Sequence, residues 1–537
     1  MVRRIAALVL ILLAGCATPT ALSPTASPPP TPLVLPTLPP AGATILASDF
    51  GKARPTLDPT TAASLPTPLP TDPPPPTPVA AGFDFALRGE FSKELNKIEN
   101  KTFYSIQWEL NDDLSELRGT QRVGFANRTK QPLDAIYFRL FANANKGEGQ
   151  IRIDRVAVGS LRVFTELQND ETVLKVWWGD QLEPGRLAVL NLEYTIQIPR
   201  EAKGRYSDFT RTDWLTTLPT VYPIIPAIDD KGWHLETPPE FGDLLYADSS
   251  TYDVTIIAPV QYTVITTGEL VQEIRSGNRI RRRFIAAPVR DFDVNITNTL
   301  VKSSAPMDGV TVNSWSKPEE AEAGKRVLDW TVNALRVYEK RFGPYPFKTL
   351  DVVESPTTAG GIEYPGVITI ASNLYADPGQ LNFFEFATAH ETAHQWFYST
   401  VGNDQVNQPW QDEALVQYVT LVYFEDRYGK ETAERLRSEF FEKQYEAAKQ
   451  KYGDLPAGLP VGAYDEEAYG AFVYAKGPLF FQAVREFIGD QAFFRALQNY
   501  YQQFKYANAQ PQDLINAFNQ ASGKDITPLY SKWIAGQ

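Results

Sequence analysis

The chain has 537 residues, which is enough for two or three domains that each bury a hydrophobic core. Hydrophobic residues make up 43% and charged residues 21%, ordinary proportions for a soluble globular protein. The net charge of -13 argues against nucleic acid as the main partner, because binding to phosphates requires clustered lysine and arginine. A single cysteine excludes a disulfide within the chain.

The N-terminus has the features of an export signal. Arg3 and Arg4 precede the apolar run Ile5–Ala14, which is too short to span a bilayer as a mature helix. The run Leu-Ala-Gly-Cys that ends at Cys16 resembles the lipobox of bacterial lipoproteins, in which the cysteine becomes the acylated N-terminus. The alternative is an ordinary signal peptide with an incidental cysteine. We expect a signal peptide over residues 1–15 and an exported protein of the cell envelope, lipid-anchored to the membrane on its extracytoplasmic side.

Residues 16–82 are dominated by Pro, Thr, Ser and Ala and contain almost half of the chain's 42 prolines. Such a segment cannot bury enough apolar surface to offset the entropy lost on ordering. Proline-rich chain instead favours extended polyproline II, at roughly 3 Å per residue. The composition therefore predicts a disordered tether that holds a folded body away from the membrane.

Residues 83–300 have the pattern of a β domain. In VLNLEYTIQI, apolar and polar residues alternate strictly, which is the period of a half-buried strand. The apolar positions are Leu190, Leu192, Tyr194, Ile196 and Ile198. The run TYDVTII repeats the pattern at Tyr252, Val254 and Ile256, and turn residues separate such runs. We therefore expect a large antiparallel β assembly over 83–300.

Residues 301–537 have the pattern of an α+β domain. The runs KTLDVVES and GVITIAS predict strands, and amphipathic stretches predict helices after them. These helices are expected at 378–401, 409–428, 431–450, 465–488, 490–505 and 511–521. For the first helix, the sequence from Asp377 supplies a cap and a proline at the first turn, and Gly402 supplies a stop.

The first of these helices carries two of the chain's three histidines. His390 and His394 are four residues apart, so their side chains lie one turn apart on one side of a helix. Two imidazoles placed in this way can bind one Zn²⁺, and Glu391 is rotated away from them to face a water beside the metal. A chance spacing of two structural histidines is the alternative, and the bare H-E-x-x-H pattern also occurs in proteins that are not enzymes.

A hydrolytic zinc site needs a third protein ligand. Glu413, in the run PWQDEALVQYV, follows His394 with eighteen residues between them. This spacing accommodates one helical turn, a loop and the start of a second, antiparallel helix. Glu413 can therefore return to the metal, and the sequence predicts one Zn²⁺ per chain held by His390, His394 and Glu413.

HETAHQWF, the eighteen-residue spacing and QDEA together resemble the aminopeptidase-N-like gluzincins. GGIEYPG, from Gly360, resembles the family's G-x-M-E-N exopeptidase motif, and YAKG, from Tyr474, resembles its Y-x-K-G segment. The resemblance covers Phe83 to the C-terminus. It implies an N-terminal antiparallel all-β domain followed by a thermolysin-like α+β zinc peptidase domain. Because the given sequence ends soon after YAKG, we expect it to hold none of the family's further C-terminal helical domains.

The resemblance also implies a role for each motif residue. Glu391 takes a proton from the attacking water, and Tyr474 donates a hydrogen bond to the developing oxyanion. Glu363, beside Gly360 and Gly361 in the substrate-binding strand, binds the free α-ammonium of a peptide by a charge-assisted hydrogen bond. One departure from the family lies in this motif, where Ile362 and Tyr364 replace its Met and Asn.

The second departure is in the β domain, where many relatives supply a glutamine or glutamate to the amine. No such residue is found before Tyr222, and Asp229 and Asp230 are only loose candidates. The remaining histidine, His234, is interpreted as structural. Lys476 is expected to be solvated on a helix surface, and Asp412 is a candidate to support a ligand histidine.

The sequence therefore predicts a zinc aminopeptidase that removes N-terminal residues from peptides. Two alternatives stay open. One is a zinc endopeptidase of the same fold, favoured by the two departures from the family motifs. The other is a non-catalytic surface lipoprotein that binds peptides. The expected partners are peptides with a free N-terminus and, through the acyl anchor, a membrane.

Overall fold

The computed structural model describes residues 82–98, 102–144, 149–158, 161–236, 239–377 and 381–536. All of them belong to one compact unit. The predicted signal peptide, Cys16 and the tether up to residue 81 lie outside the described residues. Within the described ranges, no helix is both long enough and apolar enough to cross a membrane.

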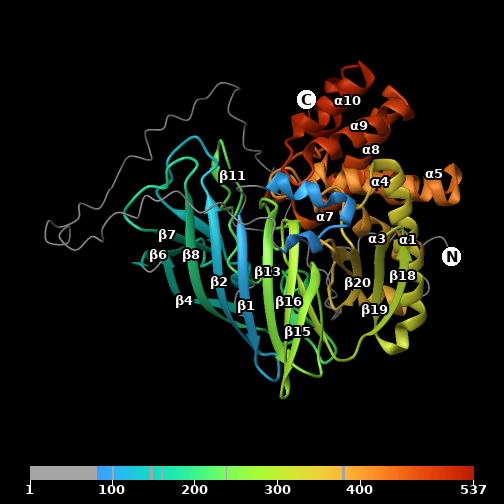
Figure 1. Cartoon of the computed structure of the whole chain (residues 1–537). Coiled ribbons are helices and arrows are strands. Elements are labelled where there is room, and N and C mark those ends of the chain that lie inside the picture. Colours follow the sequence, from blue (N-terminus) through green and yellow to red (C-terminus); the bar gives the residue numbers. More distant parts are fainter. Residues whose placement is uncertain are drawn as a thin grey trace, which may run out of the picture. The chain divides into compact units, whose positions relative to one another are not determined.

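An eight-stranded sheet forms the first half of the body, in the order β15-β16-β13-β1-β2-β8-β4-β5 (Figure 1). Its strands are β1 (Phe103–Leu110), β2 (Glu116–Ala126), β4 (Gln150–Val158), β5 (Leu161–Arg162), β8 (Leu187–Gln197), β13 (Ser250–Pro259), β15 (Glu269–Ser276) and β16 (Arg279–Val289). Neighbouring strands are antiparallel except for β1 and β13, which pair in parallel. The predicted antiparallel β assembly is therefore confirmed, with one parallel pair at its centre.

The period-2 alternation places the predicted strand face in the core. In β8, Leu190, Leu192, Tyr194 and Ile196 are buried, because alternate side chains point to one face of the sheet. In β13 the other face is partly covered too, since Thr251 and Thr255 are also buried.

Smaller sheets complete the β half. A four-stranded sheet has the order β14-β17-β10-β9, a three-stranded sheet has the order β3-β7-β6, and β11 pairs with β12. Their strands are β3 (Ile136–Arg139), β6 (Phe164–Gln168), β7 (Val173–Trp177), β9 (Thr210–Arg211), β10 (Thr216–Thr217), β11 (Ile228–Asp229), β12 (Gly232–Trp233), β14 (Thr263–Thr266) and β17 (Val294–Thr297).

The second half is built on a five-stranded mixed sheet, in the order β18-β19-β20-β22-β21. Its strands are β18 (Val301–Met307), β19 (Val310–Ser316), β20 (Thr349–Ser355), β21 (Gly361–Ile362) and β22 (Val367–Ala371). The strands predicted from KTLDVVES and GVITIAS are β20 and β22. β19, β20 and β22 are parallel, and the short edge strand β21 runs antiparallel to β22.

Helices pack around this sheet and beyond it (Figure 1). They are α1 (Ala321–Phe342), α2 (Ser372–Ala376), α3 (Leu381–Ala393), α4 (Glu413–Tyr428), α5 (Lys430–Arg437), α6 (Lys443–Tyr452), α7 (Glu466–Ala471), α8 (Gly477–Ile488), α9 (Asp490–Phe504), α10 (Pro511–Ser522) and α11 (Thr527–Tyr530). The sequence analysis assigned no helix to α1, which connects β19 to β20 and packs against α3.

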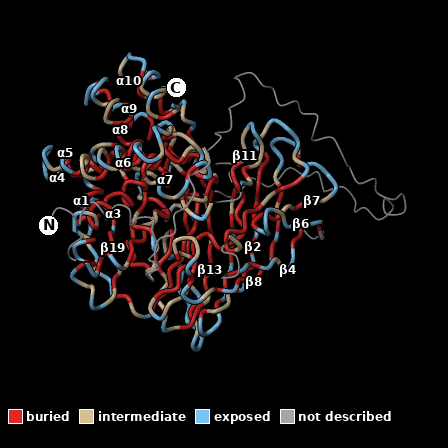
Figure 2. Tube along the Cα trace, turned by 180° about the vertical axis from the view of Figure 1, so that it is seen from behind, coloured by how far each residue is buried: buried red, intermediate tan, exposed pale blue. Residues whose placement is uncertain are grey.

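The predicted helix 378–401 is wrong at its C-terminal end. α3 ends at Ala393, and the chain then makes turns in which the amide of Val401 bonds to the carbonyl of Trp396. Residues 378–380, which contain most of the predicted cap, lie outside the described residues. Buried residues concentrate along the strands and in α3 (Figure 2). A helix buried on nearly all sides gives no amphipathic pattern from which its end could be read.

The segment before β1 packs against the helical half. It contains the short helices η3 (Phe83–Phe85) and η4 (Gly89–Ile98). Arg88 bonds to Glu339 on α1 at 2.9 Å, and the buried Lys505, after α9, bonds to Glu94 at 2.8 Å. The first described residues are thus bonded to α1 and to the segment after α9 before the chain enters the eight-stranded sheet.

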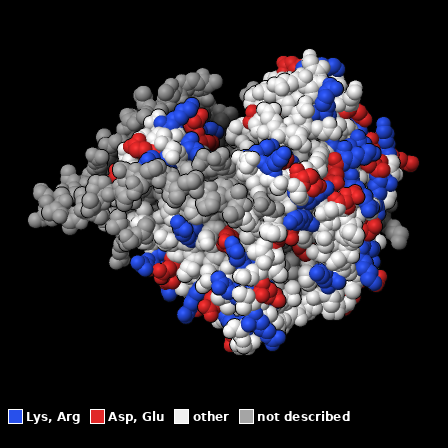
Figure 3. Space-filling view, viewed as in Figure 1, with Lys and Arg blue, Asp and Glu red and all other residues white. Residues whose placement is uncertain are grey.

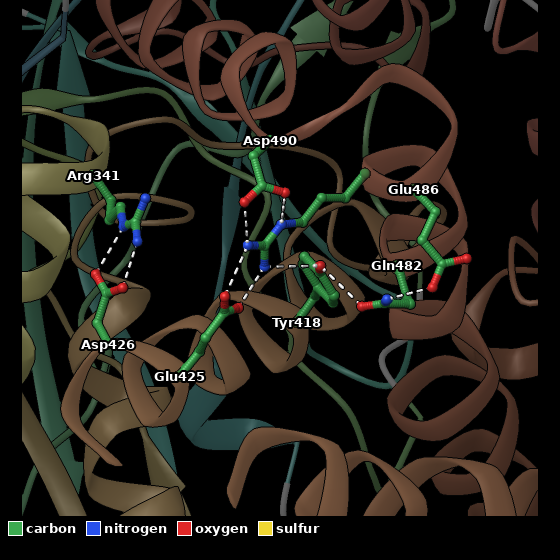
Figure 4. Close-up of polar contacts among 8 residues, drawn as sticks. Arg341, Tyr418, Glu425, Asp426, Gln482, Glu486 and Asp490 are labelled. Atoms are coloured by element: carbon green, nitrogen blue, oxygen red, sulfur yellow. Dashed lines mark hydrogen bonds and ion pairs between the residues drawn. The ribbon is translucent and has the colours of Figure 1, made fainter. Parts of the chain in front are cut away.

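An arginine network fixes α4 relative to its neighbours (Figure 4). Arg485 on α8 bonds to Glu425 on α4 at 2.6 Å and to Asp490 on α9 at 2.9 Å. Arg341 on α1 pairs with Asp426 on α4. The network matters for the site because α4 begins at Glu413.

On the face shown in Figure 3, lysine and arginine side chains are interspersed with aspartate and glutamate side chains.

Candidate metal centre

The last turn of α3 brings the two histidines together. The Nε2 atoms of His390 and His394 lie 3.1 Å apart, and both side chains are buried. Although α3 ends at Ala393, the amide of His394 still bonds to the carbonyl of His390 at 3.3 Å, so the one-turn spacing is kept. Nδ1 of His394 lies 3.0 Å from the carbonyl of Phe397, so it donates the proton and leaves Nε2 free as a ligand atom.

Glu413, the first residue of α4, supplies the third candidate ligand atom. Its Oε2 lies 3.3 Å from Nε2 of His390 and 3.6 Å from Nε2 of His394. Asp412 caps α4 by accepting a hydrogen bond from the amide of Glu413 at 2.9 Å. Asn403 in turn donates to Asp412 at 3.2 Å, so Asp412 supports the carboxylate ligand and the helix start.

These three side chains fit a zinc ion. Tetrahedral zinc with bonds of about 2.1 Å has ligand atoms about 3.4 Å apart, and the three distances here are 3.1, 3.3 and 3.6 Å. Oε2 of Glu413 is buried, yet it accepts no hydrogen bond of normal geometry from the described residues. A buried carboxylate oxygen that lacks a hydrogen-bond donor is stabilised by a bound cation, because an uncompensated buried charge is costly.

Glu391 lies beside the triad and packs against the strand of Gly361. A Cβ atom at position 361 would lie 2.5 Å from Cγ of Glu391, so the glycine provides the space for this side chain. Burial raises the pKa of Glu391 well above its ordinary value, and the carboxyl groups of Glu363 and Glu413 act in the same direction. A carboxyl group with a raised pKa is suited to accept and return a proton.

Glu363 follows β21 and is also buried. Its Oε1 accepts a hydrogen bond from the side chain of Gln405 at 3.1 Å. Burial raises the pKa of Glu363, and Glu413 adds to this, while His394 opposes it. The main chain beside it is ordered as well, since the carbonyl of Gly360 accepts a hydrogen bond from Ala371 at 3.1 Å.

Asp243 is the site residue that the sequence analysis missed. It comes from the β half, and carboxylate oxygens of Asp243, Glu363 and Glu413 all lie within 4.8 Å of one another. Burial and the nearby Glu363 raise the pKa of Asp243 well above its ordinary value. Of the two loose candidates, Asp229 instead bonds to His234 at 2.9 Å. No local motif marks Asp243, so only the tertiary contact could have identified it.

Tyr474 lies on a π-helical turn, η12 (Phe472–Lys476), between α7 and α8. Its ring centre is 6.3 Å from that of His390, and burial raises its pKa well above the ordinary value, so the hydroxyl stays protonated. Gly477, the glycine of YAKG, lets this turn approach α4, because a Cβ there would lie 2.5 Å from that of Ala414. Single π-helical turns often occur at functional sites.

Two other predictions can be compared with the structure. Lys476 was expected to be solvated, and this is wrong: its side chain is buried, and Nζ bonds to Asp454 at 2.6 Å and to the carbonyl of Leu455 at 2.7 Å. His234 has the structural role expected of it. It is 8% exposed, bonds to Asp229, and lies 3.7 Å from Asp404 of the helical half.

The site carries an excess of negative charge. Its acidic side chains are Asp243, Glu363, Glu391, Asp412 and Glu413. The imidazoles of His390 and His394 lie beside them, the guanidinium groups of Arg205 and Arg290 act on Asp243 and Asp412, and burial raises the pKa of Asp412 to about 7. Buried carboxylates are stable only when cations or donors compensate them. The arrangement therefore suits a divalent metal together with a second, organic cation.

Comparison with known proteins relates the second half to a peptidase family. The model of the peptidase family M1 domain matches residues 326–533. This segment is similar to M1 peptidase domains. It contains the three metal-ligand candidates, Glu363, Glu391 and Tyr474.

Curated proteins that match this chain are aminopeptidases by name. Aminopeptidase 2 of Candida albicans is 22% identical over 370 residues, which is 66% of this chain and 39% of that protein. Aminopeptidase N of Haemonchus contortus is 27% identical over 314 residues, which is 54% of this chain and 32% of that protein. The chain spans about a third of the length of the curated relatives it matches.

Among solved structures, the M1 zinc metallopeptidase from Deinococcus radiodurans is similar, with a TM-score of 0.59 and 18% identity. The match covers 81% of this chain and 94% of that one. At this identity the likeness shows the fold. It confirms the predicted order of a β-rich half followed by an α+β half with many helices.

Proposed function

We propose that the protein is a zinc-dependent aminopeptidase that hydrolyses N-terminal residues from peptides. The observation that carries this proposal is the position of Asp243 and Glu363. Their carboxylates lie beside Glu413 at one side of the metal triad, within 4.8 Å of its oxygen. Two acidic groups at this distance from a metal ligand suit a substrate that presents an ammonium group next to the bond to be cleaved.

His390, His394 and Glu413 would hold the zinc, whose chemistry when bound is to polarise the scissile carbonyl and activate a water. The other steps belong to protein side chains. Glu391 accepts a proton from the attacking water and returns it to the leaving amine, which needs a carboxylate of raised pKa. Tyr474 donates a hydrogen bond to the carbonyl oxygen as negative charge develops, a contribution of about 3–4 kcal/mol in well-placed donors.

Substrate register follows from the acidic pair. The α-ammonium of a peptide bonds to Glu363 and Asp243, so only the first peptide bond reaches the metal. Blocking the amine by acetylation removes both the charge and two donor hydrogens. An internal segment of a peptide has no ammonium to offer, and its backbone amide cannot compensate two buried carboxylates. This arrangement favours exopeptidase over endopeptidase activity.

A rate panel tests the proposal. The purified full chain loaded with zinc is given fluorogenic aminoacyl amides with free amines and their N-acetylated twins. We expect rapid cleavage of the free amines, no measurable cleavage of the acetylated substrates, and loss of activity on treatment with a zinc chelator that zinc restores. Glu363→Gln should raise KM for the free amines because half of the acidic pair is lost. Cleavage of both substrate sets would support an endopeptidase, and cleavage of neither a peptide-binding protein.

For the N-terminus, we propose export and acyl anchoring at Cys16, supported by the basic start, the short apolar run and the lipobox resemblance. The test is metabolic labelling with a fatty acid in a bacterial host, followed by membrane fractionation. We expect the wild-type chain to carry label and to sediment with membranes. Cys16→Ser should abolish both without changing peptidase activity. Equal labelling of the variant would contradict the proposal.

A further inference from the structure

We propose that Gln405 is a positioning residue that holds Glu363 in the geometry needed to bind a substrate's α-ammonium. This inference rests on the proposed aminopeptidase function. Gln405 lies in the connector between the two metal-binding helices and is 1% exposed. Its side-chain amide donates to Oε1 of Glu363 at 3.1 Å. The connector therefore sets the distance between His394 and Glu413 and also supplies the donor that positions Glu363.

Glu363 needs such a donor because its surroundings disfavour its charged form. It is buried, and the carboxylates of Asp243 and Glu413 lie within 4.8 Å of its own. Like charges at this distance repel each other strongly in a medium of low dielectric constant. A hydrogen bond to one oxygen stabilises the carboxylate and stops it from rotating away from its neighbours.

The side chain of Gln405 is uncharged, and this is important for binding the substrate's ammonium. A lysine or arginine at this position would form an ion pair with Glu363 and compete with the substrate's ammonium for it. A neutral amide bonds to one oxygen and leaves the net negative charge to attract the ligand. A side-chain amide can thus orient Glu363 without neutralising the negative charge that binds the substrate.

A second glutamine fixes the main chain of the same strand. Gln395 directly follows His394 and is fully buried. Its side-chain oxygen accepts from the amide of Gly366 at 2.9 Å, and its nitrogen donates to the carbonyl of Tyr364 at 3.2 Å. The backbone of the amine-binding strand is therefore bound to the metal helix, and the remaining freedom is that of the Glu363 side chain, which Gln405 restrains.

The connector is itself rigid around Gln405. Asp404 accepts hydrogen bonds from the amide and the side chain of Asn407, at 3.0 and 2.9 Å. The carbonyl of Val406 accepts from the amide of Val461 at 2.9 Å. A donor that positions another side chain must itself be held in place, and these contacts do so on both sides of Gln405.

The test compares Gln405→Leu and Gln405→Glu with the wild-type zinc enzyme. Loss of a hydrogen bond to a charged group corresponds to about a 10- to 100-fold weakening. We expect KM for free-amine substrates to rise by that factor in Gln405→Leu while kcat changes little. The glutamate side chain of Gln405→Glu has nearly the same shape as glutamine, so this variant should fold. Its KM for free-amine substrates should rise more than that of Gln405→Leu, because it places a carboxylate against Glu363.

Binding measurements separate positioning from general damage. In zinc-loaded Glu391→Gln protein, calorimetry gives the Kd of an aminoacyl amide and of its N-acetylated twin, with and without Gln405→Leu. We expect weaker binding of the free amine only. Equal weakening of both ligands, or of neither, would overturn the inference. If the wild-type enzyme cleaves nothing, the proposed function fails, and this binding comparison still decides the role of Gln405.

Gln411→Leu is the matched control. It removes a second buried glutamine from the same connector, one that donates to Tyr500 and to the carbonyl of Ala509, both at 3.0 Å, and not to Glu363. Its loss should lower the melting temperature without a selective change in KM for free amines. A rise in KM equal to that of Gln405→Leu would mean that the effect comes from the connector as a whole, which would also overturn the inference.

Discussion

Replacing Glu391 by Gln is expected to lower kcat by about 10²- to 10⁴-fold, the range attributed to a positioned general acid–base group. The carboxamide keeps the size of the side chain and its packing against Gly361. It cannot take a proton from water at neutral pH, so the attacking nucleophile and the leaving amine both lose their proton carrier. Zinc content, measured by atomic absorption on the purified variant, should remain one per chain, because Glu391 is not one of the three candidate ligand side chains.

Glu385→Gln provides the control on the same helix. Glu385 is a largely buried glutamate of α3 that accepts a hydrogen bond from Tyr423 at 2.6 Å, outside the metal triad. A carboxamide can still accept that bond, so activity should stay close to wild type. Undiminished turnover in Glu391→Gln would refute the assignment of the proton carrier, and equal losses in both variants would point to damage to α3.

Replacing Arg290 by Met is expected to destabilise the protein by about 3 kcal/mol or more, because each buried acceptor that loses its donor costs about 1–3 kcal/mol. Arg290 is 2% exposed and donates to the carbonyls of Ala247 at 3.0 Å, Ser399 at 3.3 Å and Ala507 at 3.1 Å, and to the side chain of Asn508. Methionine fills a similar volume but has no donors. Three carbonyl oxygens would then be buried without this partner.

Thermal and urea unfolding measure this effect, and Arg281→Met is the control. Arg281 lies on β16 and is exposed, so its replacement should change stability by no more than about 0.5 kcal/mol. Equal unfolding midpoints for the two variants would contradict the role given to Arg290. Thermal scans should be repeated at two heating rates, since a large chain can unfold irreversibly.

The contacts of Arg290 that stabilise the fold also hold two segments of the site together. Ala247 follows Asp243 by four residues, and Ser399 follows the end of the metal helix. Arg290 therefore holds the β-half segment that carries Asp243 against the segment that follows His394. Gly402 completes this junction, because a Cβ there would lie 2.1 Å from Nη1 of Arg290. A partial loss of this contact should weaken amine binding before it abolishes zinc binding.

Several features could be predicted from local sequence because they depend on local geometry. The period of 2 in β8 and the four-residue spacing of His390 and His394 each specify a relation between side chains a few residues apart. The eighteen-residue spacing to Glu413 identified the third ligand candidate because a connector of that length suits two antiparallel helices. β20 and β22 were predicted from their apolar runs, which are also a local feature of the sequence.

The tertiary structure decided what depends on distant parts of the chain. α3 is buried nearly all round, so its sequence lost the periodicity that marks a helix end. Asp243 joins Glu363 across 120 positions, and Gln405 reaches Glu363 across 42. The sequence by itself predicted the candidate metal ligands and the order of the two halves, because residue spacing and local periodicity indicate both. Only packing between the halves decided which carboxylates meet beside that set, because no local period records a contact between distant segments.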